Sequence, residues 1–362
     1  MDNPQDRISQ LAATIFHNTE RISGYLSGNM LPALSFKADP PLKLPEELDS
    51  ARAAVAEATE ELNQLMLGPK EALYLQAQHD LVSLYIIVDY GIAKMFSVGE
   101  ETTFEQLAET SGLREGEVAR VLRHAITKHI FHEPRKGIVE HTAASRLLAQ
   151  DEGFLDWVDV NLQETWPAAA QTVNAMRKWP NSRCPAQTGF SYSQDTEESL
   201  FEYLEKYPER AKRFVHGMSA FNTGPGYILD YVVDKFPWAS LGEASVVDVG
   251  GSTGEMMIAL ATKFPLLNAV VQDLPNTIAE YLIPPRGVER RINFMAHDFF
   301  TKQPVRGADM YFFRLVLHNW SDEDCFRILR AIVPALKPGA RIIATELCLP
   351  PFETVQPSRS DD

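Results

Sequence analysis

The sequence of 362 residues has little cysteine, little positive charge and no long hydrophobic run. Its three cysteines, Cys184, Cys325 and Cys348, lie far apart, which excludes a disulfide framework and a Cys-x-x-Cys metal or redox motif. Lys and Arg number 34 against 49 Asp and Glu, and the net charge of −15 argues against a polyanionic partner such as nucleic acid. No apolar run approaches the ~18 residues that a membrane span requires.

Further absences narrow the class of protein. The first ten residues, MDNPQDRISQ, lack the basic-then-apolar order of a signal peptide, so we expect a cytoplasmic protein in a reducing compartment. No ligand set for a metal is evident, and there is no internal repeat. What remains is an ordinary globular composition, with 45% hydrophobic and 23% charged residues, in a chain long enough for two domains.

Residues 1–150 are predicted to form a helical domain that is winged-helix-like. Two helices flank a proline-rich break that contains Pro32, Pro40, Pro41 and Pro45. Helical patterns then cover 104–110 and 115–129, a strand-like stretch covers 130–141, and a further helix covers 143–149. Helix, helix, wing and helix is the order of a winged helix.

Residues 151–362 are predicted to form a second domain of a different kind. Residues 151–240 are helical in pattern and rich in aromatic side chains, whereas wholly apolar runs alternate with helices in 241–350. Such strands are buried on both faces, so the pattern predicts an α/β fold: a Rossmann-like parallel sheet covered by helices. The strands are expected at 246–249, 269–272, 292–296, 310–317 and 341–347, and helices begin near Glu255, Asn276 and Ser321.

The segment 246–255, VVDVGGSTGE, is the strongest local signal. A buried strand ends at Gly250, Gly251 and Gly254, and a helix follows. Glycines allow the backbone to approach a ligand closely, and a helix N-terminus favours negative groups. Asp248 precedes the glycines and would place a carboxylate beside the ligand, which suits a cationic ligand better than a pyrophosphate.

Acidic residues also follow the next two strands. Asp273 comes about 20 residues after the glycines, where a carboxylate commonly binds a ribose hydroxyl pair. Asp298 and Phe299 follow the third strand and offer a carboxylate for an adenine amino group and a ring for its face. Turn or cap roles explain each residue alone but fit the set poorly. The carboxyl ends of these strands therefore predict a nucleotide cofactor site.

The fourth strand leads into the segment 311–323, YFFRLVLHNWSDE. His318 lies just past the strand, beside Asn319, again at a carboxyl end. An isolated histidine there is more often structural than catalytic, so both interpretations stay open. Ser321 with Asp324 three residues later indicates a helix start rather than a metal site.

Taken in order, the segments DVGGSTGE, QDLP, HDFF, RLVLHNWSDE and ATELCLPP resemble the plant caffeate-type O-methyltransferases and their fungal relatives of secondary metabolism. The resemblance extends from about Leu81 to Pro351, and the ordered set is far more specific than any single motif. It implies a methyltransferase that uses S-adenosylmethionine (SAM) to methylate a hydroxyl of an aromatic or polyketide-type small molecule. It also implies a homodimer formed through the N-terminal domain.

The resemblance assigns roles to individual residues. His318 corresponds to the general base, and Glu346 to a carboxylate that orients the imidazole. The residues implied in cofactor binding are Asp248, Gly250, Gly251, Asp273, Leu274, Asp298, Phe299 and Arg314. Those implied in the acceptor pocket are Phe214, Met218, Asn222 and Asn319.

These roles agree with elementary chemistry. Carboxylates and aromatic faces are suitable neighbours for a sulfonium, and an in-line displacement depends mainly on positioning. A phenol of pKa ~10 faces a histidine of pKa ~6.5, so full proton transfer is uphill by ~5 kcal/mol. We therefore expect a metal-independent reaction in which Glu346 stabilises the imidazolium of His318.

Two features depart from the family pattern. Asn319 stands where an Asp is usual, and we expect a modest effect on substrate contacts. The chain ends at Asp362, whereas the family continues past the fifth strand with a helix and two more strands. We accordingly expect either a shortened form whose sheet keeps an exposed apolar edge, or another segment or subunit that covers this edge.

Three other functions stay open. Some relatives of this fold bind SAM yet catalyse pericyclic or dehydration steps, and the short C-terminus also allows an inactive SAM-binding subunit. The winged-helix order allows a DNA binder, but seven Lys and Arg in 101–150 are balanced by seven Glu, which favours dimerisation. The basic residues are Arg114, Arg120, Arg123, Lys128, Arg135, Lys136 and Arg146, and the acidic ones are Glu101, Glu105, Glu109, Glu115, Glu117, Glu133 and Glu140.

Overall fold

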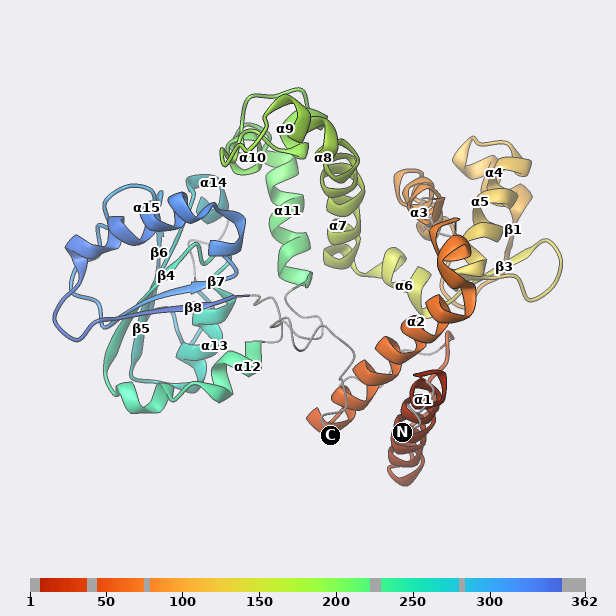
Figure 1. Ribbon diagram of the computed structural model, residues 1–362, viewed down its shortest axis with the longest axis horizontal. Coiled ribbons are helices and arrows are strands. Elements are labelled where there is room, and N and C mark those ends of the chain that lie inside the picture. The colour runs from red at the N-terminus through yellow and green to blue at the C-terminus, as the bar shows by residue number, and fades with distance from the viewer. Residues whose placement is uncertain (1–6, 38–43, 75–78, 222–228, 280–283, 347–362) are drawn as a thin grey trace, which may run out of the picture. The chain divides into compact units, whose positions relative to one another are not determined.

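The computed structural model describes residues 7–37, 44–74, 79–221, 229–279 and 284–346. The chain divides into two compact units, Met1–Leu155 and Asp156–Asp362 (Figure 1). The cofactor motifs and the catalytic residues that the sequence predicts all belong to the second unit.

The first unit begins with two long helices that pack against each other. Ile22, Leu26 and Leu48 are buried in this contact, and Arg7 makes a two-pronged ion pair with Glu61 at 2.7 and 2.6 Å. A backbone kink with φ of +70° at Gly68 interrupts the second helix where the sequence becomes more apolar. The helices here are α1 (Arg7–Gly28), α2 (Glu46–Tyr74), α3 (His79–Asp89) and the short 3-10 helix η1 (Ile92–Lys94).

The rest of the first unit has the predicted winged-helix order. Its strands pair antiparallel in the order β1-β3-β2. Capping boxes start two of its helices, one from Thr103 with Gln106 and one from Thr142 with Ser145, as short polar side chains at these positions favour. The elements are β1 (Thr102–Thr103), α4 (Phe104–Ser111), α5 (Glu115–Thr127), β2 (Phe131–His132), β3 (Ile138–His141) and α6 (Ala143–Gln150).

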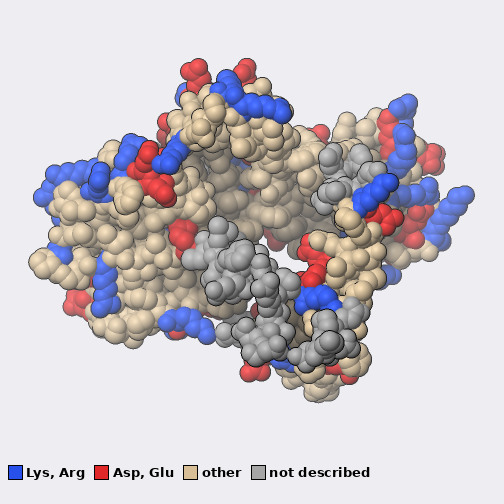
Figure 2. Space-filling view, viewed as in Figure 1, with Lys and Arg blue, Asp and Glu red and all other residues tan. Residues whose placement is uncertain are grey.

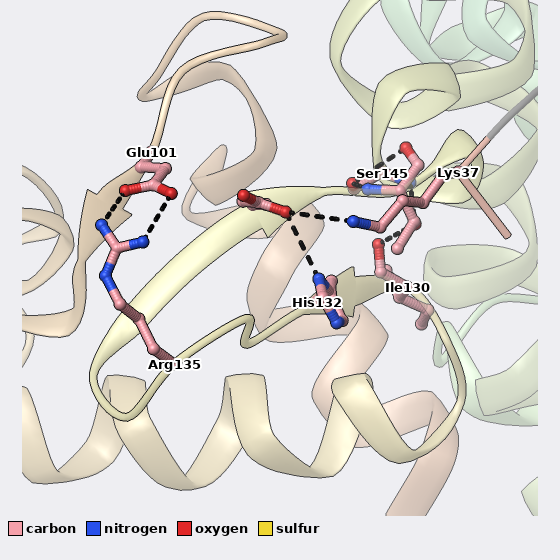
Figure 3. A network of polar contacts seen from close by, with 8 residues as sticks. Lys37, Glu101, Ile130, His132, Arg135 and Ser145 are labelled. Carbon is pink, nitrogen blue, oxygen red and sulfur yellow. Dashed lines mark hydrogen bonds and ion pairs between the residues drawn. The ribbon is translucent and has the colours of Figure 1, made fainter.

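Charged side chains of both signs are interspersed over the face of this unit seen in Figure 2. Around the wing they pair directly (Figure 3): Arg135 donates to Glu101 at 3.0 Å. Glu140 lies 3.3 Å from His132 and 3.7 Å from Lys37. Basic groups that are engaged by carboxylates in this way are poorly placed to bind phosphates.

Helices form the first part of the second unit. α7 and α11 approach closely, because Gly217 has no side chain: a Cβ there would lie 2.8 Å from the backbone N and Cα of Trp157. A π-helical segment, η2 (Asn161–Thr165), joins α7 (Glu152–Val160) to α8 (Trp166–Lys178). Beyond it lie α9 (Gly189–Ser193), α10 (Leu200–Lys206), α11 (Pro208–Phe221), α12 (Leu229–Lys235) and η3 (Trp238–Leu241).

Among the described residues, five strands form a parallel sheet in the order β6-β5-β4-β7-β8. Its two faces follow the period-two alternation of a strand. Val246, Met310 and Phe312 pack with residues of α12 and α13, whereas Val247 and Tyr311 pack with those of α15 on the other face (Figure 1). The strands are β4 (Ala244–Val249), β5 (Leu267–Asp273), β6 (Ile292–Ala296), β7 (Met310–Arg314) and β8 (Arg341–Thr345), and the helices are α13 (Glu255–Lys263), α14 (Pro275–Ala279), η4 (Leu317–Asn319), α15 (Asp322–Ile332) and η5 (Val333–Ala335).

The predicted fold class is confirmed: a helical N-terminal region precedes a five-stranded, parallel, Rossmann-like sheet. The expected strand at 310–317 is shorter, because β7 ends at Arg314 and Leu315 takes a φ of +54° that no strand continues. β8 forms one edge of the described sheet, and Ile342 on it is exposed.

Candidate active site

The loop between β4 and α13 is packed tightly against the strand ends. The N–H groups of Gly250 and Gly251 both donate to the carbonyl of Gln272, at 2.8 and 3.0 Å. A Cβ on Gly251 would lie 2.5 Å from Asp248 Oδ2, and one on Gly250 would lie 2.9 Å from Val316 Cγ2. Gly250 also has a φ of +75°, which side chains disfavour. The backbone conformation therefore favours glycine at Gly250, and the side chains packed against Gly251 leave no room there for a Cβ.

Asp248 lies on β4 beside this loop and is only 2% exposed. Burial, and then the charge of Asp273, raises the pKa of Asp248 to about 7, while Arg314 opposes the shift. Burial likewise lowers the pKa of Arg314, which Asp248 and Glu255 oppose. A nearby cation favours the charged form of a carboxyl group. The site therefore fits a ligand that carries positive charge, as the sulfonium and ammonium groups of SAM do.

Asp273, at the end of β5, ties the glycine loop to the next turn. Its Oδ2 accepts the N–H of Ser252 at 2.8 Å, and its Oδ1 accepts the N–H of Leu274 at 2.8 Å. Ser252 has a φ of +50°, an uncommon value for a residue other than glycine. Burial raises the pKa of Asp273, and the two N–H groups oppose this shift. Each carboxylate oxygen can accept more than one hydrogen bond, so a ribose hydroxyl can still be bound.

The residues after β6 approach the same loop. Cε1 of Phe299 lies 3.7 Å from the position of a Cβ on Gly250. Asp298 is exposed, and its Oδ1 accepts the N–H of Phe300 at 2.9 Å. His297 Nε2 is buried without a hydrogen bond to the described residues, and burial lowers its pKa. The ring of Phe299 thus lies beside the glycine loop, whereas the carboxylate of the preceding Asp298 is exposed, and a role of these residues in adenine binding stays a prediction.

His318 and Glu346 meet although 28 residues separate them. They follow the neighbouring strands β7 and β8, and His318 Nδ1 lies 2.7 Å from Glu346 Oε2. The other oxygen, Oε1, accepts the N–H groups of Val316 and Leu317 at 2.9 and 2.7 Å. A carboxylate only accepts, so Nδ1 donates, and Nε2 is left as the acceptor. The histidine side chain is 36% exposed and that of Glu346 17%, so the imidazole is open to a ligand while its partner is covered.

The residues implied in the acceptor pocket come from two segments. Phe214 and Met218 lie four residues apart on α11, and both are partly buried. Asn319 follows His318 directly and is exposed. Asn222 lies outside the described residues.

An aromatic chain joins α11 to the cofactor side of the unit. Phe214 packs edge-on to Phe201 with ring centroids 6.2 Å apart, and Phe201 stacks on Trp320 at 5.9 Å. Trp320 meets Phe299 edge-on at 5.7 Å. The predicted acceptor and cofactor residues are therefore linked by direct packing.

Four residues of this region were not assigned a role from the sequence. Ser252 supplies an N–H to Asp273, and Glu255 accepts a hydrogen bond from Ser219 of α11. Trp320 and Glu164 pack or pair with elements far along the chain. Ser252 and Glu255 lie within the glycine motif, so the sequence could have indicated a role for both. Nothing in the local pattern around Glu164 marks it.

Other kinds of site were also sought in the described part of the chain. It contains no group of three or more His, Cys, Asp or Glu side chains arranged to hold a metal ion. No helix within it is long and apolar enough to cross a membrane.

The chain matches the O-methyltransferase domain family over residues 176–359. It is 40% identical over 355 residues to the grayanic acid biosynthesis cluster O-methyltransferase of Cladonia grayi, with 96% of this chain and 74% of the relative covered. It is 36% identical over 357 residues to the chlorophenol O-methyltransferase of Trichoderma longibrachiatum, with 95% of this chain and 76% of the relative covered.

A solved structure described as a pericyclic reaction enzyme superposes with a TM-score of 0.69 and 25% identity, covering 85% of this chain and 80% of the other. Fold alone therefore does not separate methyl transfer from pericyclic chemistry. The domain match covers half of the sequence, and the fungal relatives cover nearly all of it. The chain therefore belongs to the family of SAM-dependent O-methyltransferases that act on small molecules of secondary metabolism.

Proposed function

We propose that the protein transfers the methyl group of SAM to a phenolic hydroxyl of an aromatic, polyketide-type molecule, with His318 as the general base. The observation that carries this proposal is the hydrogen bond of 2.7 Å between His318 Nδ1 and Glu346 Oε2. The bond fixes the tautomer, so that Nε2 can accept the proton of an acceptor hydroxyl. The chlorophenol O-methyltransferase activity of a relative supports a phenolic acceptor.

When bound, SAM supplies a methyl group on a positively charged sulfur. We infer that Asp248, Gly250, Gly251, Asp273, Leu274, Asp298, Phe299 and Arg314 hold it at the carboxyl ends of β4 to β7. As the acceptor oxygen bonds to the methyl carbon, the carbon–sulfur bond breaks and its electron pair stays on sulfur. The hydroxyl proton passes to His318 Nε2, and the negative charge of Glu346 stabilises the imidazolium. Phe214, Met218, Asn222 and Asn319 would line the acceptor pocket.

The test is methyl transfer to a panel of phenols, namely pentachlorophenol, resorcinol and orcinol, with product detected by mass. We expect His318→Ala to lower the rate about 10²- to 10⁴-fold, the usual contribution of a general base. Binding of S-adenosylhomocysteine (SAH), measured by calorimetry, should stay unchanged. A His318→Ala variant with full rate would refute the role of the base.

One observation favours a second function. The likeness to a pericyclic reaction enzyme allows bound SAM to act as a fixed positive charge beside a substrate that is not methylated. The paired base argues for methylation, because a pericyclic step moves no proton to a base. The two functions differ in stoichiometry: methyl transfer releases one SAH for each product, and the alternative releases none.

We further propose that the first unit forms a homodimer and that the protein is cytoplasmic. The paired charges of the wing support dimerisation over binding of nucleic acid. Large apolar side chains exposed in α1 and α2 offer a surface for a second copy.

A further inference from the structure

Glu164 lies in an unusual piece of backbone between α7 and α8. The segment Asn161–Thr165 is π-helical, and the N–H of Trp166 donates to the carbonyl of Asn161, five residues earlier. Such a widened turn is rare and disfavoured in isolation, so it persists where the surrounding structure requires it. Glu164 lies within this turn and contacts α11 from it.

The side chain of Glu164 is only 4% exposed, and it binds two guanidinium groups. Its Oε1 accepts from Arg210 Nε at 2.8 Å and from Arg213 Nη2 at 2.7 Å. Arg213 Nη1 lies 2.9 Å from Asp159 Oδ2 on α7. Arg210 Nη1 also donates to Gln194 at 3.0 Å. Two carboxylates and two guanidiniums thus form a neutral, largely buried cluster.

Stability alone is a weak explanation for this cluster. Burying ions costs several kcal/mol for each one, and apolar residues of similar volume often stabilise a core as well or better. Moreover, Glu164 Oε2 and Arg213 Nε are buried without a hydrogen bond to the described residues. What such a cluster does provide is a fixed geometry, because Glu164 Oε1 holds two guanidiniums of α11 at once, and Arg213 also reaches Asp159 on α7 through charge-assisted hydrogen bonds.

The geometry that it fixes is that of α11. Arg210 and Arg213 lie three residues apart on one face of this helix, and Gly217 continues the face four residues later. At Gly217 the helix touches the backbone of Trp157, so it has no room to move toward α7. Phe214 and Met218 each follow a residue of this face by one position, which is a rotation of about 100°. They therefore lie on the adjoining face, and their direction depends on the anchored one.

We propose that Glu164 is a positioning residue for the acceptor: through Arg210 and Arg213 it sets the rotation of α11 and hence the placement of Phe214 and Met218. This inference rests on the proposed function, in which these two side chains line the acceptor pocket. Phe214 connects through Phe201 to Trp320, two residues beyond His318. A small rotation of α11 is thereby passed to the neighbourhood of the base.

The test uses the full chain and three variants. Glu164→Gln removes the charge at constant shape, Gly217→Ala displaces α11 sterically, and Glu323→Gln is the control. Glu323 pairs with Arg183 at 2.9 Å on the surface, with side chains that are 72% and 65% exposed. Initial rates are measured with the best of pentachlorophenol, resorcinol and orcinol, and SAH affinity is measured by calorimetry.

We expect Glu164→Gln and Gly217→Ala to lower kcat/KM for the phenol about 10- to 100-fold, the scale of a misplacement by about 1 Å. SAH affinity should change less than about two-fold, and Glu323→Gln should behave as the wild type. For resorcinol the ratio of mono- to dimethylated product should also shift, which a loss of stability alone would not cause.

Two results would overturn the inference. One is unchanged kcat/KM in a folded Glu164→Gln protein, and the other is a loss of SAH affinity in both variants that is as large as their loss of kcat/KM. If Glu164→Gln does not fold, two other variants test the inference in its place. One is Gly217→Ala. The other is Arg213→Lys, which keeps the positive charge but cannot reach both Glu164 and Asp159 in the same way. A wild type that methylates none of the phenols but binds SAH contradicts the proposed function instead.

Discussion

Asp248 should make the affinity for SAM depend on pH near neutrality. Its pKa of about 7 reflects burial and the neighbouring Asp273, against the opposing charge of Arg314. Below that pH the group is a neutral acid, and above it a carboxylate that attracts the sulfonium. We therefore expect SAM affinity to rise with pH, by up to about 10-fold per pH unit below the pKa. Calorimetry between about pH 5.5 and 8 measures how SAM affinity changes with pH. Asp248→Asn should remove this dependence.

Ionisation of Asp248 has the opposite effect on the ligand-free protein, because it lowers the stability of the fold. An acid whose pKa is raised on folding contributes most to stability below its ordinary value of 3.8, and the contribution is lost as the pH rises through about 7. The difference is up to ~4 kcal/mol. Urea unfolding should therefore show Asp248→Asn gaining stability relative to the wild type as the pH increases. A constant difference across this range would contradict the shift.

Substitution of Glu346 should slow catalysis without weakening cofactor binding. Glu346→Gln keeps an oxygen for the N–H groups of Val316 and Leu317, but it removes the charge that stabilises protonated His318. We expect kcat to fall about 10²-fold or more, within the range of general base catalysis. SAH affinity should be retained in calorimetry. If Glu346→Gln preserves kcat, the carboxylate of Glu346 stabilises the turn after β7 and has no part in catalysis.

The glycine loop allows a prediction for a whole element. Gly251→Ala would place a Cβ 2.5 Å from Asp248 Oδ2 and 2.9 Å from Val271 Cγ1, so the loop or β4 must move. We expect a loss of about 1–3 kcal/mol of stability, as for overpacking in a core, together with weaker SAH binding. Gly116→Ala in α5 is the matched control, because its Cβ meets nothing within 4 Å. It should stabilise the protein by about 0.5–1 kcal/mol in urea unfolding.

Elements with a clear period were predictable from the sequence, and those set by distant contacts were not. β6 was expected at 292–296 and lies there, because the strand pattern is contained in these residues themselves and requires only a neighbouring strand to pair with. The strand expected to reach Leu317 ends at Arg314, where Glu346 accepts the following N–H groups from 30 residues away. Glu164 in the π-helical turn likewise binds two arginines of α11, a contact that no local pattern reveals.

The candidate site also contains features that the sequence could predict and features that it could not. The spacing of glycines and carboxylates at successive strand ends placed Asp248, Asp273 and Phe299 around one loop. Parallel strands bring their carboxyl ends to one edge, so the order of motifs was enough. The aromatic chain from Phe214 to Phe299 was not predictable, because it depends on how α10 and α11 pack. The roles of these residues stay predictions.

The whole molecule is expected to be a dimer in solution. Side chains of α1 and α2 expose large apolar groups, among them Phe16 at 68% and Met66 at 58%. Monomers rarely leave large apolar patches in water, so a second copy is expected to cover them. Phe16→Asp should shift the mass measured by light scattering from that of two chains toward that of one.

The control for this prediction comes from the second unit. Phe326 on α15 is 60% exposed, comparable to Phe16, and Phe326→Asp should leave the dimer intact. If the winged-helix part serves dimerisation, neither variant nor wild type should retard duplex DNA in a shift assay. A wild type that is monomeric at micromolar concentration, or one that binds DNA with strong salt dependence, would contradict the assignment. Because carboxylates engage Arg135, Lys37 and Arg123, we expect the DNA assay to be negative even at low salt.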